Sequence, residues 1–341
     1  MVWTQRRYTN NKFIKRTNAP IEAKALMVIL EANKSIKQNQ ELTQIQKNEL
    51  IKVNTLKALN LYLKTSHIEN QPPWMFSSFQ IEDLKKIILG IPKPKKFKTI
   101  SEDGNIIYKT HYEYIKPREY MFLRCRNGSK TRDATMLIVF LGYMRNHWGA
   151  YNRNVWYSAS QSQIDVVKGY LERNKFVKET TLKKATLWNN NEIHLRIMTE
   201  NQAVSPRSDY LFFDEQQKMK EHAYSLSLGT GLEINAGRKI HLGTTATDTI
   251  LHRNYIKLEP LGLVSTHTIK DCDWLDEEEA LKAYEGSPEW YINTQLYCKW
   301  EQPGGRVFDN IEQRDIPNWY NYATDICFGT DPNPKSGHGL V

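Results

Sequence analysis

Residues 119–131 hold the side chains best suited to phosphate chemistry. A short apolar run bounded by charges predicts a buried strand, and a polar turn with one glycine follows it and ends in Lys130-Thr131. An apolar segment of helical length then begins at the threonine. Strand, turn, Lys-Thr and helix is the order of a phosphate-binding loop, in which backbone N–H groups and the positive helix end receive phosphates. Lys130 would bind the outer phosphates, and the Thr131 hydroxyl would hold Mg²⁺.

This loop departs from the usual spelling G-x-x-x-x-G-K-[ST]. Arg126 stands near its start, and Ser129 occupies the position before the lysine. A glycine there lets the backbone approach phosphate closely, so Ser129 is expected to adopt a less common conformation, or the loop is shifted. Taken alone, Gly-Ser-Lys-Thr is a common surface tetrapeptide. The rest of the chain must therefore decide the interpretation.

A second informative stretch covers residues 205–215. Its consecutive large apolar residues predict a strand buried on both faces, as in a parallel sheet, and the strand ends in Asp214-Glu215. Beside a phosphate-binding loop, Asp214 would hold Mg²⁺, usually through a water. Glu215 would orient and deprotonate the water that attacks the γ-phosphate. The alternative is an acidic pair that simply closes a strand.

Two further motifs suit the same chemistry. Residues 239–247 predict an apolar strand that ends in Gly243 and a cluster of hydroxyls, where Thr244 or Thr245 would bond the γ-phosphate or the attacking water. A threonine-rich turn is the alternative. Upstream, Phe79-Gln80 would place an aromatic ring and an amide against adenine, since a glutamine amide can donate and accept at once. The alternative there is an ordinary helix start.

Composition limits the classes of protein to consider. The chain has 341 residues, 40% of them hydrophobic and 25% charged, which suits one large α/β domain with an appendage. No apolar run approaches the roughly 20 residues that span a bilayer, and no secretory signal is recognisable, so a cytoplasmic protein is expected. The four cysteines lack metal-ligand spacing and are expected to be buried thiols. The net charge of +9 suits a polyanion such as DNA or RNA, or else reflects a Lys-, Asn- and Ile-rich composition.

The other segments predict the elements around these motifs. A basic arm covers residues 1–20, and the apolar residues of a helix over 41–64 are expected to form one stripe: Leu42, Ile45, Leu50, Val53, Leu56 and Leu63. Asp103-Gly104 predicts a basic hairpin of strands 95–100 and 105–115, which faces DNA or a partner or is a surface decoration. Other helices are expected at 21–32, 81–89, 161–173, 276–284 and 287–300, a strand at 154–160, a hairpin over 186–199, and a pair of strands within 255–264.

From residue 74 to residue 337 these motifs resemble the large terminase subunit, the ATP-driven motor and nuclease that packages viral DNA into capsids. The Arg-x-x-Gly-Lys-[Ser/Thr] loop of the family matches residues 126–131 except at Ser129. Its apolar strand plus Asp-Glu matches residues 211–215, and its coupling turn resembles residues 244–246 without the proline. The resemblance implies an α/β P-loop (ASCE-type) NTPase with a mostly parallel sheet flanked by helices, an N-terminal helical appendage, and ATP and Mg²⁺ as ligands.

The resemblance also implies roles for individual residues. Arg126 would stabilise transition-state charge, and such arginines contribute about 10³–10⁵ in rate. The implied catalytic residues are Glu215, Arg126 and Lys130, and the coupling residues are Thr244 and Thr245. The implied ATP-binding residues are Gln80, Asn127, Gly128, Ser129, Lys130, Thr131 and Arg132, and the implied metal ligands are Thr131 and Asp214. The implied partners are double-stranded DNA, the portal protein of a procapsid, the small terminase subunit and further copies of the chain in a ring.

Three segments are expected: an arm and helical subdomain over 1–70, the ATPase domain over 71–310, and a linker with the first strand of an RNase H-like nuclease over 311–341. Asp331 would be the first nuclease metal ligand. Two-metal chemistry needs further carboxylates that the sequence lacks, so no nuclease activity is expected. Two other functions stay open. One is a helicase-like nucleic-acid-dependent ATPase, although no second motor lobe follows residue 250, and the other is a docking protein with a degenerate nucleotide loop.

Overall fold

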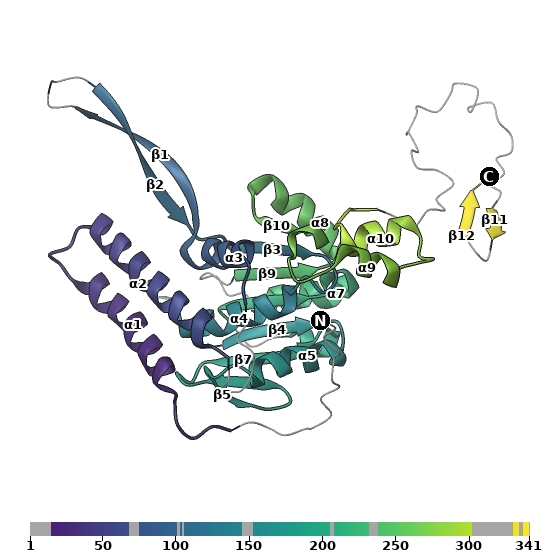
Figure 1. Cartoon of the computed structure of the whole chain (residues 1–341), viewed down its shortest axis with the longest axis horizontal. Helices are drawn as coiled ribbons and strands as arrows, with labels where there is room; N and C mark the ends of the chain where they lie inside the picture. Colours follow the sequence, from purple (N-terminus) through teal and green to yellow (C-terminus); the bar gives the residue numbers. More distant parts are fainter. Residues whose placement is uncertain are drawn as a thin grey trace.

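The computed structural model describes residues 15–67, 75–100, 103, 106–144, 153–204, 208–231, 238–301, 330–333 and 337–340. Its centre is an eight-stranded sheet with the strand order β10-β3-β9-β8-β4-β7-β6-β5 (Figure 1). The strands from β10 to β7 pair in parallel, and β6 and β5 continue the sheet antiparallel. Their bounds are β3 Glu119–Arg124, β4 Arg153–Ser158, β5 Val177–Thr180, β6 Lys184–Leu187, β7 Glu192–Ile197, β8 Tyr210–Asp214, β9 Arg238–Gly243 and β10 Val264–His267.

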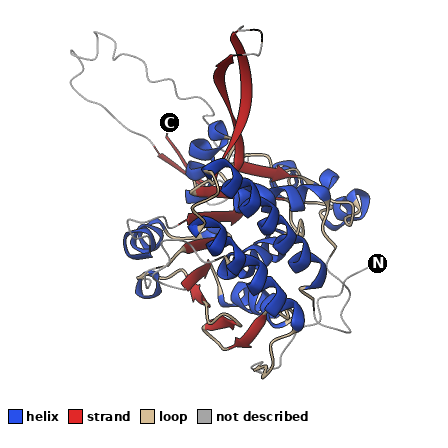
Figure 2. Cartoon of the chain, turned by 90° about the vertical axis from the view of Figure 1, so that its left-hand side faces the viewer, coloured by secondary structure: helices blue, strands red, loops and turns tan. Residues whose placement is uncertain are grey.

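Helices cover both faces of this sheet (Figure 2). Alternate residues of each strand point to opposite faces, so that Phe212 packs in the core under α1–α5 while its neighbour Phe213 packs under α6–α8. The helices are α1 Ile21–Gln38, α2 Gln44–Thr65, α3 Ser78–Leu89, α4 Lys130–Tyr143, α5 Gln161–Glu172, α6 Glu200–Ala203, α7 Glu221–Gly231 and α8 Ile250–Leu258. The expected α/β architecture, a mostly parallel sheet flanked by helices with N-terminal helices added, is confirmed.

The N-terminal helices α1 and α2 pack on α4, and α2 also contacts the turn that follows α5. The Tyr62 hydroxyl donates to the Met136 carbonyl at 3.0 Å and accepts from Asn174 Nδ2 at 2.8 Å, which fixes α2 against the core. The single apolar stripe expected for this helix is wrong in part. Leu63 is buried, but Ile45, Leu50 and Val53 are exposed, because only the C-terminal half of α2 reaches the core and buries Thr55, Ala58, Leu59 and Tyr62.

The pair of strands expected within 255–264 is also wrong. This region forms α8, the 3₁₀ turn η2 (Glu259–Leu261) and then the single strand β10 beside β3. The Thr249 hydroxyl accepts from the backbone N–H of His252 at 3.3 Å and so begins the helix. Leu251 and Leu258, two turns apart, then pack on Met121 and Leu123 of β3.

An antiparallel hairpin of β1 (Ile91–Ile100) and β2 (Ile106–Ile115) extends from the body beyond the end of α3 (Figure 1). The expected hairpin is confirmed and begins four residues earlier in β1 than its sequence pattern indicates. After β10 the chain forms η3 (Ile269–Asp271), α9 (Glu277–Ala283) and α10 (Glu289–Leu296). Asp331 lies on β11 (Thr330–Asn333), which pairs with β12 (Gly337–Leu340), whereas residues 302–329 lie outside the described part. Over the described ranges, no helix has the length and apolar character that crossing a bilayer requires.

Candidate nucleotide-binding site

Three neighbouring strands deliver the motif residues to one edge of the sheet. β9 lies between β3 and β8, and all three run in parallel, so their carboxyl ends meet. The loop that carries Lys130 follows β3, Asp214 ends β8, and Thr244 follows β9 directly. Ligands of open α/β sheets bind outside the carboxyl ends of the strands. The fold therefore places the three predicted motifs together where such a ligand binds.

The loop itself has an uncommon backbone. Asn127 and Ser129 both lie in the left-handed region, with φ of 64° and 61°. Ser129 directly precedes the first helical residue, so the unpaired N–H groups of the first turn of α4 open at the loop. A Cβ on Gly128 would lie 3.0 Å from the carbonyl oxygen and from Sγ of Cys125, which favours glycine there. The uncommon conformation expected for Ser129 is confirmed.

Lys130 is buried and lies between the other two motifs. Its Nζ is 3.3 Å from Oε1 of Glu215 and 3.3 Å from Oγ1 of Thr244. Only 8% of the residue is exposed. A buried ammonium needs anionic or polar partners, and both partners here lie where an outer phosphate would compete for it.

Thr131 and Asp214 form a second contact at the same edge. The Thr131 hydroxyl donates to Oδ1 of Asp214 at 3.3 Å. Burial, followed by the charge of Glu215, raises the pKa of Asp214 to about 7, although Lys130 and the Thr131 hydroxyl act against this rise. A hydroxyl and a carboxylate are hard oxygen donors that fit Mg²⁺, which takes one or two protein ligands in phosphate sites. No group of three or more His, Cys, Asp or Glu side chains able to hold a metal occurs in the described ranges.

Glu215 is held by cations on two sides. Besides Lys130, it contacts Lys218 Nζ at 3.1 Å and accepts from Gln217 Nε2 at 2.8 Å. Burial alone would raise its pKa, but the charges of Lys130 and Lys218 outweigh burial and lower it. Its backbone is left-handed with φ of 55°, a conformation that is rare outside glycine and turns the chain sharply after β8. Glu215 is therefore ionised at neutral pH.

The hydroxyl cluster after β9 connects this edge to the C-terminal helices. Thr245 Oγ1 donates to the carbonyl oxygen of Thr294 in α10 at 3.0 Å. The loop after β3 also contacts α10, because the backbone N–H of Arg126 donates to the carbonyl oxygen of Gln295 at 2.8 Å. The predicted phosphate-binding loop and the predicted sensor thus contact consecutive carbonyls of one helix.

Sequence reasoning missed a buried ionic cluster beneath the loop. Arg124, the last residue of β3, is fully buried and donates to Asp83 Oδ2 at 2.9 Å and to Asp133 Oδ2. Ser265 and Tyr120 complete the set by donating to Asp83 at 2.5 and 3.1 Å. The only signal in the sequence was a charge at each end of an apolar run. This cluster joins α3, β3, α4 and β10 and fixes the loop from below.

Gln80 belongs to this cluster in the structure. It lies in the first turn of α3, where its Oε1 accepts from the backbone N–H of Ser77 at 2.7 Å and its Nε2 donates to Asp133 Oδ2 at 2.8 Å. The side chain is fully buried. Both ends of the amide expected to read adenine are therefore engaged within the protein. Phe79 stacks on His267 with ring centroids 3.9 Å apart.

The remaining predicted residues lie at the rim of the loop. Arg126 is exposed, and its charge acts on the pKa of Tyr284; no hydrogen bond or ion pair joins its side chain to Lys130 or Glu215 in the described part. Arg132 lies over the ring of Trp274, whose Nε1 donates to the Asn127 carbonyl at 3.3 Å. A hollow of about 620 Å³ nearby is lined by 273–278. Four of those six lining residues are acidic, so the hollow does not suit a phosphate.

Structural comparison finds matches to solved structures of bacteriophage large terminases. The large terminase of a thermophilic bacteriophage, in complex with ADP, matches with 11% identity and a TM-score of 0.49, over 70% of this chain and 57% of that chain. The large terminase ATPase domain of Thermus phage P74-26 matches with 10% identity and a TM-score of 0.44, over 54% and 89%. The HK97 bacteriophage large terminase matches with 10% identity and a TM-score of 0.46, over 70% and 53%.

This likeness concerns the fold alone. No protein-family model and no curated protein sequence matches the chain. The chain spans 57% of the length of the ADP-bound terminase.

Proposed function

We propose that this chain binds ATP with Mg²⁺ and hydrolyses the anhydride bond to the terminal phosphate. The supporting observation is that Lys130 joins Glu215 and Thr244 while Thr131 joins Asp214, all at one sheet edge. With ATP in the loop, Lys130 would exchange Glu215 for phosphate oxygens. The ionised Glu215 carboxylate would then be free to orient a water and accept its proton. Mg²⁺ held by Thr131 and Asp214 would neutralise charge on the β- and γ-phosphate oxygens.

We further propose that the chain is the motor domain of a terminase large subunit, which translocates double-stranded DNA into a procapsid. The motifs at 126–131, 211–215 and 244–246 support it, as does the contact of Thr245 with α10, which offers hydrolysis a path to the rest of the molecule. In this role Arg126 would act on transition-state charge. The partners would be a portal protein, a small terminase subunit and further copies of the chain.

Initial rates of ATP hydrolysis by the full chain test the chemistry. Lys130→Ala and Glu215→Gln should each lower the rate by at least about 100-fold, because each removes a group acting on the transferring phosphoryl or on the water. The Lys184–Glu192 pair on β6 and β7 provides matched controls, Lys184→Ala and Glu192→Gln, whose rates should stay unchanged. Wild-type turnover in both site variants would contradict the proposal.

Duplex DNA tests the motor assignment separately. A motor should hydrolyse ATP faster when duplex DNA is present and should displace a third strand from a triplex ahead of it. Hydrolysis that duplex DNA leaves unchanged would contradict the motor assignment while leaving the ATPase intact.

A further inference from the structure

The hairpin β1–β2 is the largest feature that the proposed chemistry does not use. Its strands pair without interruption from Ile91 opposite Ile115 to Ile100 opposite Ile106. At about 3.3 Å per residue, the hairpin is about 30 Å long. In both views its outer half lies beside no other described element (Figures 1 and 2). A lone two-stranded ribbon is marginally stable in water, so a ribbon of this length would gain stability from a partner.

The base of the hairpin is fixed to the body. Lys52 of α2 places its Nζ 4.0 Å from the ring centroid of Tyr114, a cation–π contact. Gly90 enters the hairpin with φ of 108°, and a Cβ there would lie 2.9 Å from the backbone of Ile115, so the chain leaves α3 in a single close-packed direction. The hairpin is therefore a directed extension of the fold.

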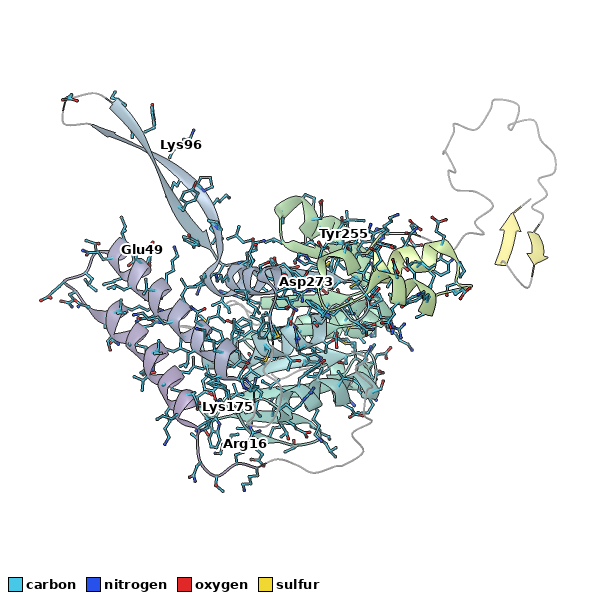
Figure 3. The ribbon with its side chains drawn as sticks, in the orientation of Figure 1. Arg16, Glu49, Lys96, Lys175, Tyr255 and Asp273 are labelled. Carbon is cyan, nitrogen blue, oxygen red and sulfur yellow. The ribbon has the colours of Figure 1, made fainter. Side chains whose placement is uncertain are left out.

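One face of the hairpin carries tyrosines and lysines together. In the register, Lys98 lies opposite Tyr108, Pro94 opposite Tyr112, and Pro92 opposite Tyr114. Because side chains alternate along a strand, these residues and Lys96 share one face, which we call the Tyr–Lys face (Lys96, Lys98, Tyr108, Tyr112 and Tyr114). Tyr108 is 71% exposed and Tyr112 is 53% exposed. Lys96 projects from the outer half of the hairpin (Figure 3).

No carboxylate occupies a position on this face. The two strands contain five lysines, at 93, 95, 96, 98 and 109, and one glutamate, Glu113. Glu113 pairs with Lys93, and both positions belong to the opposite face of the hairpin. Lysine and tyrosine side chains are both phosphate-contacting groups in protein–DNA complexes, and a two-stranded β-ribbon fits the major groove.

The base of the hairpin is also electropositive. Desolvation, followed by the positive charges of Arg238 and Lys37, lowers the pKa of Lys116, although this residue is exposed. The charges of Arg238 in β9 and Lys37 in α1 thus act on Lys116, which directly follows β2, and a phosphate bound there would relieve their repulsion.

We propose that the Tyr–Lys face contacts duplex DNA through its backbone phosphates, without preference for base sequence. The choice of duplex DNA rests on the proposed function above. The net charge of +9 agrees with a polyanionic partner. Contact of this kind would let the chain hold DNA at a distance from the nucleotide site.

Fluorescence anisotropy with a labelled 30-base-pair duplex, without nucleotide, tests this contact. The full chain is compared with Lys96→Gln/Lys98→Gln and with Tyr108→Ser/Tyr112→Ser. The matched control is Lys183→Gln/Lys282→Gln, which removes the same charge from two exposed lysines outside the hairpin. The lysine variant should bind roughly tenfold more weakly near 0.1 M salt, with a salt slope smaller by about 2, because two phosphate contacts are lost. The tyrosine variant should also bind more weakly, and the control should bind as wild type.

Three outcomes would overturn the proposal. The first is equal binding by the hairpin variants and the control, and the second is tighter binding of a single strand of the same length than of the duplex. The third is that, without DNA, the wild-type chain sediments as an oligomer and the hairpin variants as monomers, which would mark the face as a contact between copies. Basal ATP hydrolysis measured on the same variants should stay at the wild-type rate. A chain that binds duplex DNA through the hairpin but hydrolyses no ATP would contradict the proposed function and leave this inference standing.

Discussion

Asp214 and Glu215 are consecutive residues, yet their surroundings move the pKa values of their carboxyl groups in opposite directions. Burial and the neighbouring charge of Glu215 raise the pKa of Asp214 to about 7, whereas Lys130 and Lys218 outweigh burial at Glu215 and lower its pKa. Neighbouring carboxyls with separated pKa values are a mark of divided roles. Glu215 is ready to accept a proton at neutral pH, and Asp214 ionises fully only above neutrality or beside a cation.

Asp214→Asn should stabilise the chain in a pH-dependent way. As pH rises from about 4 to about 7, the unfolded carboxyl loses its proton before the folded one does, so Asp214 lowers the free energy of unfolding over this window. Its removal should raise the free energy of unfolding at pH 8 by about 2–4 kcal/mol and change it little at pH 4. Urea unfolding at both pH values measures this. Asp165→Asn, at an exposed position, is the control.

The same variant should lose ATP hydrolysis, because an amide is a poorer Mg²⁺ ligand than a carboxylate. A more stable but inactive chain would show that burial of Asp214 serves chemistry and not folding. An equal effect on stability at pH 4 and pH 8 would contradict the role assigned to its pKa.

Arg124→Met should be among the most destabilising single changes. It leaves the carboxylates of Asp83 and Asp133 buried without their shared cation, which costs about 3–5 kcal/mol for a broken buried pair. Arg253→Met is the matched control, since Arg253 forms an ion pair with Glu221 at 2.8 Å on the surface, where such pairs contribute about 0–1 kcal/mol. Urea unfolding compares the two variants, and similar losses would contradict the importance of the buried cluster.

The parts of the candidate site that are formed by adjacent residues could be predicted from the sequence. Lys130-Thr131 after an apolar run and Asp214-Glu215 after another predict both the parallel strands and their shared edge, because strand burial and residue type are local signals. The conformation of Ser129 was likewise foreseeable, since its position demands a backbone that L-residues seldom adopt.

Long-range partners could not be predicted in the same way. Asp83 lies 41 residues before Arg124, and no spacing rule connects the two. Gln80 shows the same limit, because its place in the first turn of α3 and its bond to Asp133 depend on where α4 packs. The sequence predicts strands over the second half of α8, because the β-branched and aromatic residues there favour strands locally. Its cap at Thr249 and its packing on β3 decided otherwise.

Thr245→Val should uncouple ATP hydrolysis from its stimulation by duplex DNA. The change removes the bond from Oγ1 to the carbonyl oxygen of Thr294 in α10 but keeps the side-chain volume. Basal ATP hydrolysis should fall less than about threefold, whereas the increase caused by duplex DNA should be lost. Thr244→Val, which removes the contact with Lys130, should instead lower basal hydrolysis by roughly 10–100-fold. Equal effects of the two changes on both rates would contradict the division of roles.

Ser129 offers the most direct test of the loop. Its φ of 61° costs an L-residue roughly 1 kcal/mol relative to glycine, so Ser129→Gly should leave the loop intact and raise the free energy of unfolding by about 0.5–1 kcal/mol. Ser129→Val should be destabilising, because a β-branched side chain tolerates this region poorly. If the loop binds phosphate, titration with ATP should show retained or tighter binding in the glycine variant and at least about tenfold weaker binding in the valine variant.

Asn190 provides the matched control for these two changes. It has a φ of 65° in the turn between β6 and β7, so Asn190→Gly and Asn190→Val impose the same backbone preferences away from the loop. Both Asn190 variants should bind ATP as the wild type does, while their free energies of unfolding shift in the same directions as those of the Ser129 pair. Equal ATP binding by Ser129→Val and Asn190→Val would mean that the backbone at residue 129 does not shape a nucleotide site.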